Sequence, residues 1–113
     1  MGMDYRYSGS ASYNRFDNEL CEVAKVFGGI EKHPDIYYGL ETAQHGDKFI
    51  FPKGTNGILV KWFNNIYYKK FTLEETIQIW KCVSEHPEIK KISLQIWKEL
   101  ETLVVCEQGW YIF

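Results

Sequence analysis

Apolar residues recur at the helical period in three segments of this chain, and this periodicity is the strongest constraint on its fold. Residues spaced three or four apart lie on one side of a helix, so each stripe predicts a helix with one buried face. The stripes predict helices at about 13–27, 73–85 and 87–104. Their apolar positions are Phe16, Leu20, Val23, Ala24 and Phe27, then Leu73, Ile77, Trp80 and Val83, then Ile89, Ile92, Ile96, Leu100 and Leu103.

Signals in the sequence mark where these helices begin and end. Gly28 and Gly29 follow the first stripe, as is common after a helix because glycine accepts the left-handed conformation. Thr72 and Glu75 have the spacing of a capping box, in which each side chain accepts from an unpaired backbone N–H of the first turn. Pro87 ends the second stripe and can open the third helix, since its missing N–H is not needed there.

The segment from about 58 to 71 favours a β-hairpin. ILVKWF and IYYKKF flank Asn64-Asn65, a pair that suits a two-residue turn because Asn tolerates positive φ. With alternating side chains, one face of the hairpin would carry Leu59, Lys61, Phe63, Ile66, Tyr68 and Lys70. Together with the helices, this predicts an α+β fold: a small antiparallel sheet with this central hairpin, packed against about three helices.

Chain length and cysteine content indicate the number of domains and the cellular compartment. With 113 residues, the chain is expected to form a single compact domain, 1–113. Its three cysteines make an odd number without paired short spacing, which favours free thiols in a reducing compartment. No apolar run approaches about 18 residues, and the first ten residues lack an apolar signal core. We therefore expect a cytoplasmic protein that does not enter a membrane.

Charge is distributed unevenly along the chain. Residues 48–71 hold five Lys and no acidic residue, whereas residues 1–47 hold four basic and eight acidic residues and residues 72–113 hold four and seven. A basic, aromatic block between acidic flanks is typical of a binding surface, because charge steers encounter and aromatic anchors supply affinity. The candidate partner-binding residues are Lys61, Phe63, Tyr68 and Lys70 on the hairpin, and Asp17 and Glu22 on the first helix, which would face a basic partner.

The sequence offers no recognisable catalytic or cofactor site. His33, His45 and His86 are scattered, and no closely spaced Cys or His pair is present, so we predict no metal site. The PKGTNG segment lacks the arrangement of a phosphate-binding loop. Capping and the helix dipole explain Glu74 and Glu75 without chemistry. No catalytic residue and no cofactor are predicted, which favours a protein that is not an enzyme.

These observations favour a small non-enzymatic protein that acts by direct protein–protein contact. In bulk character the chain resembles the compact, acidic, aromatic-rich proteins that phages and mobile elements use against bacterial defence systems. That resemblance implies an inhibitor of a bacterial defence protein.

The sequence is also compatible with two other functions and with a homodimer. The hairpin, with its lysines beside Phe63 and Tyr68, could bind single-stranded nucleic acid by stacking, although the pI of about 5.9 and only two Arg argue against it. A pocket between sheet and helices could sequester a small ligand or nucleotide. An edge strand or the third helix could form a symmetric homodimer.

Overall fold

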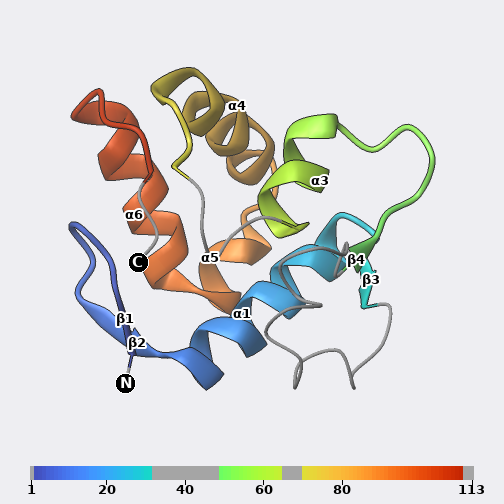
Figure 1. Ribbon diagram of the computed structural model, residues 1–113, viewed down its shortest axis with the longest axis horizontal. Helices are drawn as coiled ribbons and strands as arrows, with labels where there is room; N and C mark the ends of the chain where they lie inside the picture. Colours follow the sequence, from blue (N-terminus) through green and yellow to red (C-terminus); the bar gives the residue numbers. More distant parts are fainter. Residues whose placement is uncertain (1, 32–48, 65–69, 111–113) are drawn as a thin grey trace.

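The computed structural model describes residues 2–31, 49–64 and 70–110 of the chain (Figure 1). Helices make up most of this part, and the strands are short. In chain order the elements are β1 (Gly2–Asp4), β2 (Ser10–Ser12), α1 (Tyr13–Val26), β3 (Ile30–Glu31), β4 (Phe49–Ile50), α3 (Gly57–Asn64), α4 (Leu73–Ser84), α5 (Glu88–Ile92) and α6 (Leu94–Val105).

The α+β class is confirmed, with helices packed beside antiparallel strands. The strands form two separate ribbons within the described residues. β1 pairs with β2, with Met3 opposite Ala11, and β3 pairs with β4, with Ile30 opposite Ile50. Figure 1 shows the β1–β2 ribbon beside the start of α1, and the β3–β4 ribbon beyond its other end. The helices therefore enclose the core, and the ribbons lie at its two margins.

The predicted helices at 13–27 and 73–85 are confirmed as α1 and α4. The capping box is also present: the Thr72 hydroxyl accepts from the Glu75 N–H at 3.1 Å, and the Glu75 carboxylate accepts from the Thr72 N–H at 3.1 Å. Gly28 has a φ of +81°, which a residue with a side chain rarely adopts. It allows the Gly29 N–H to donate to the Ala24 carbonyl at the end of α1.

The helix predicted at 87–104 is two helices, α5 and α6, which meet at Ser93. Ser93 is extended, with φ −145° and ψ 98°, and its hydroxyl accepts from the Ile96 N–H. The same hydroxyl donates to the Glu19 carboxylate of α1 at 3.0 Å. Ser93 thus caps a new helix and ties the break to α1. The apolar stripe runs through the break, so periodicity alone does not reveal it.

The β-hairpin predicted over 58–71 is wrong across its first strand, because residues 57–64 form the helix α3. Asn56 begins this helix: its side-chain oxygen accepts from the Ile58 N–H at 3.1 Å, and its carbonyl accepts from the Leu59 N–H at 3.0 Å. The second predicted strand lies largely at 65–69, outside the described residues.

Burial explains why the helix forms in place of the strand. A strand would place Trp62 and Phe63 on opposite faces, whereas α3 buries both, together with Ile58 and Leu59. Nearly every position of ILVKWF is apolar, so the segment shows neither helical nor alternating periodicity clearly. The tertiary contacts therefore decide its conformation.

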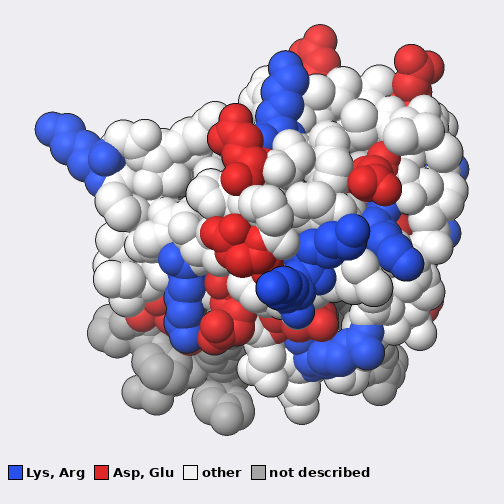
Figure 2. Space-filling model, turned by 180° about the vertical axis from the view of Figure 1, so that it is seen from behind, with Lys and Arg blue, Asp and Glu red and all other residues white. Residues whose placement is uncertain are grey.

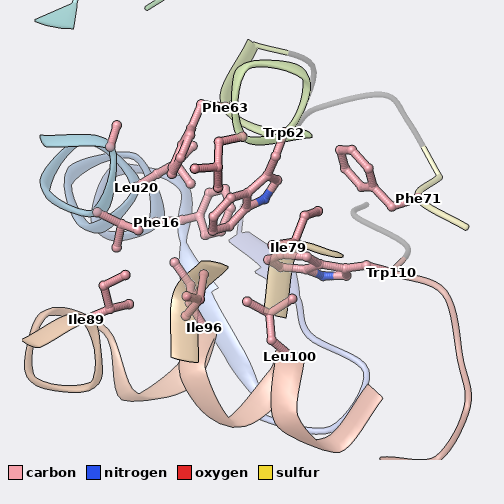
Figure 3. Packing of buried hydrophobic residues seen from close by; sticks show 14 of the residues in the cluster. Phe16, Leu20, Trp62, Phe63, Phe71, Ile79, Ile89, Ile96, Leu100 and Trp110 are labelled. Carbon is pink, nitrogen blue, oxygen red and sulfur yellow. The ribbon is translucent and has the colours of Figure 1, made fainter. Parts of the chain in front are cut away.

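The core lies where α1, α3, α4, α5 and α6 converge (Figure 3). Trp62 of α3 contacts Trp110 near the chain end, with ring centroids 5.6 Å apart. The largest fully buried side chains are Trp62, Trp110, Phe16, Phe63, Phe71, Leu20, Ile79, Ile89, Ile96 and Leu100. They come from every helix, so a single apolar cluster holds the helices together.

The segment after α6 returns to the start of α4 and closes the core. The Phe71 N–H donates to the Trp110 carbonyl at 2.9 Å, and the Trp110 N–H donates to the Thr76 hydroxyl at 3.1 Å. Gly109 passes so close that an added Cβ would collide with the Phe71 carbonyl oxygen. Glycine is therefore required at this crossing.

The loop after β1 is fixed to α6 by a buried carboxylate. Glu99 is fully buried, and its two oxygens accept from the backbone N–H groups of Arg6 at 2.8 Å and Tyr7 at 2.9 Å. Gln95, one turn earlier, donates to the carbonyls of Ser8 and Ser10. These bonds hold the N-terminal ribbon against one side of α6.

Candidate functional site

Two of the residues predicted to form a binding face on the hairpin, Lys61 and Phe63, lie on the helix α3 instead. Lys61 is exposed on α3 and forms an ion pair with Glu75 of α4. Phe63 is only 1% exposed and packs on Trp62 in the core. Lys70 is exposed in the connection to α4, and Tyr68 lies outside the described residues.

Basic side chains also do not gather on the face of the molecule that Figure 2 shows. Lys and Arg are interspersed there with Asp and Glu. The segregation of charge along the sequence is therefore not repeated on this face. Folding brings the acidic helices against the basic segment, as the Lys61–Glu75 ion pair between α3 and α4 illustrates.

The acidic candidates Asp17 and Glu22 both line an open hollow along the outer face of α1. The hollow has a volume of about 780 Å³. Six of its described lining residues come from α1, at positions three or four apart that follow the helical period. The described lining consists of Asn14, Asp17, Asn18, Cys21, Glu22, Lys25 and Glu31.

This site is negatively charged. Asp17, Glu22 and Glu31 contribute three carboxylates to the described lining, and Lys25 contributes one ammonium group, which gives a formal charge of −3 + 1 = −2. The Lys25 ammonium donates to the Glu22 carboxylate at 3.0 Å, and this contact raises the pKa of Lys25. Both side chains are largely exposed, so water screens the pair and it contributes little stability.

Glu31 brings the third carboxylate from a different element, β3. Its Oε1 atom is buried without a hydrogen-bond partner among the described residues. A buried carboxylate oxygen favours a cationic or N–H donor, because its desolvation is otherwise uncompensated. The site therefore combines the exposed carboxylate of Glu22 with those of Asp17 and Glu31, which belong to half-buried residues.

The chemistry of the lining suits recognition of a cation by hydrogen bonds. Carboxylates accept from guanidinium or ammonium groups, and the amides of Asn14 and Asn18 both donate and accept. Within the described part of the chain, no three His, Cys, Asp or Glu side chains are placed to hold a metal ion. Cys21, which lines the hollow, and Cys82 and Cys106 elsewhere form no disulfide bond.

The sequence predicts Asp17 and Glu22 as binding residues, but not the other residues of the hollow. The signal that sequence reasoning missed is the stripe of polar residues at 14, 17, 18, 21, 22 and 25, which complements the apolar stripe of the same helix. Glu31 could not be found in this way, because it joins the site only after the chain turns back from α1 into β3.

Comparisons with protein-family models, curated protein sequences and solved structures found no match. In the described residues, no helix has the length and apolar character needed to cross a membrane.

Proposed function

We propose that the protein is a small binding protein that contacts a basic surface of another protein through the acidic hollow along α1. The observation that carries this proposal is that Asp17, Glu22 and Glu31 line one hollow, whose described lining has a formal charge of −2. The site suits a protruding Arg or Lys side chain, since a carboxylate binds a guanidinium group in bidentate geometry and an ammonium group as a point charge.

The size and openness of the hollow support a macromolecular partner. A volume of about 780 Å³ exceeds that of a single side chain, so a loop or helix end carrying several basic groups would fit. Carboxylates at such a site accelerate encounter with a basic partner, and hydrogen bonds at the centre supply specificity. Inhibition of a bacterial defence protein is one form that this binding would take, and it rests on the resemblance in bulk composition.

The burial of Phe63 argues against the alternative function, which is binding of single-stranded nucleic acid. It required Phe63 and Tyr68 on one face beside lysines, but Phe63 is buried in the core. The carboxylates at the hollow would repel phosphate groups.

A pull-down from a bacterial lysate, with and without nuclease treatment, tests the proposal. We expect stoichiometric recovery of a protein with a basic surface, unaffected by nuclease and reduced as salt rises. Recovery of nucleic acid alone, or loss of the bound protein after nuclease treatment, would contradict the proposal. Thermal stabilisation by a cationic small molecule without any protein partner would instead indicate a small-ligand site.

A further inference from the structure

The outer face of α6 carries four exposed residues in one line, apart from the acidic hollow. They occur at offsets of zero, four, seven and eleven, which place them on one side of a helix. The four residues are Leu94, Lys98, Glu101 and Val105. Leu94 is 45% exposed and Val105 is 77% exposed, which is high for large apolar side chains. The opposite side of α6 is buried in the core.

Neighbouring elements border this face but leave it open. On one side the N-terminal ribbon is bound through Gln95 and Glu99. On the other side α4 packs against α6, with the rings of Trp80 and Trp97 5.0 Å apart. Figure 1 shows α6 between the ribbon and α4, at the margin of the molecule. The open strip between these two contacts is as long as α6 itself, about 18 Å for 12 residues.

The order of residues along the strip is self-complementary. From the N-terminal end it reads apolar, basic, acidic, apolar. If two copies pack α6 against α6 in antiparallel orientation, a two-fold axis midway between positions 99 and 100 places Leu94 opposite Val105 of the partner subunit. The same axis places Lys98 opposite Glu101 of the partner subunit. A parallel arrangement in the same register would place Lys98 against its own copy, which is repulsive.

We propose that this face is the interface of a symmetric homodimer in which the two α6 helices pack antiparallel. Each copy supplies the same surface, as a two-fold interface requires. Lys98 and Glu101 make no ion pair within the described part of the chain, so both are available to the partner subunit. The apolar ends are covered in the same step, which removes exposed Leu94 and Val105 from water.

The predicted dimer is weak and depends on concentration. One helix pair buries an area at the low end of specific interfaces, so the protein would be monomeric when dilute. Every contact occurs twice because of the symmetry, and a single substitution therefore acts at two places. This doubling makes the interface sensitive to mutation.

Sedimentation equilibrium over a concentration series, with a reductant present to keep the exposed Cys106 reduced, tests the proposal. Lys98→Glu and Glu101→Lys each place like charges across the interface, so each single variant is expected to raise the Kd about tenfold. The double variant K98E/E101K restores opposite charges and is expected to return the Kd close to that of the wild type. This rescue distinguishes a specific antiparallel contact from general charge repulsion.

Leu94→Ser and Val105→Ser provide a second, apolar test, and each is also expected to raise the Kd about tenfold or more. Circular dichroism confirms that each variant remains folded, which is expected because all four side chains are exposed in the monomer. A wild type that stays monomeric up to its solubility limit would overturn the proposal. A dimer whose Kd is unchanged by these substitutions would overturn it too.

Discussion

Replacing Glu99 with Gln is the sharpest test of how the N-terminal ribbon is held. The Glu99 carboxylate is fully buried and accepts two backbone N–H groups, from Arg6 and Tyr7. Gln has almost the same shape but only one acceptor oxygen, and its NH₂ group would face the second N–H. One hydrogen bond to a charged group is therefore lost, and a partly buried N–H donor is left without a partner.

The expected cost follows from these two terms. A hydrogen bond to a charged group contributes about 1.5–3 kcal/mol, and a donor that is unpaired and only partly buried costs about 1 kcal/mol. Because the two overlap, we expect Glu99→Gln to lower the free energy of unfolding by about 2–4 kcal/mol. This is a large share of the total of about 5–15 kcal/mol expected for a native domain.

Urea denaturation followed by tryptophan fluorescence measures this change, since Trp62 and Trp110 are buried in the core. Glu101→Gln is the matched control: it makes the same chemical change two residues away on α6, but at an exposed position. We expect the control to stay within about 0.5 kcal/mol of the wild type, at a concentration where the monomer dominates. An equally small effect of Glu99→Gln would refute the role given to this carboxylate.

Two further predictions concern the start of α4 and the segment after α6. Lys61 and the Thr72 N–H lower the pKa of Glu75 below its ordinary value of 4.5. The ionised Glu75 carboxylate therefore stabilises the folded state fully above about pH 4.5, and this contribution is lost as pH falls through the folded-state pKa. The stability difference between wild type and Glu75→Gln should then shrink in acid, and thermal melts showing a constant difference would contradict this. Gly109→Ala should lower the free energy of unfolding in urea by about 1–3 kcal/mol or more, because the new Cβ meets backbone atoms. Gly57→Ala is the control, since its Cβ meets open space. Equal stabilities of the two variants would contradict the close approach at Gly109.

The parts of the fold that the sequence predicts are those with local causes. α1 and α4 follow from one apolar stripe each, and the Thr72–Glu75 capping box sets the start of α4 independently of the rest of the chain. Such signals act over a few residues, so they do not depend on the tertiary structure.

The parts that it does not predict depend on distant contacts. α3 is helical because α1, α4 and the chain end bury both Trp62 and Phe63, and the run ILVKWF carries no period that shows this. The break at Ser93 depends on Glu19, which lies 74 residues earlier. In the candidate site, the α1 residues could be found from their spacing, whereas Glu31 depends on the turn into β3.

The most direct test of the proposed function compares the Kd of the recovered protein partner for three forms of this chain. Asp17→Asn with Glu22→Gln brings the formal charge of the described lining of the hollow from −2 to zero. Glu74→Gln with Glu85→Gln makes the same change in net charge at exposed positions on and after α4. We predict that the first pair weakens binding at least about tenfold, because each lost charge contact costs about 1 kcal/mol, and that the second pair leaves the Kd close to the wild type. Equal weakening by both pairs, or no weakening by the first, would show that the hollow along α1 is not the binding site.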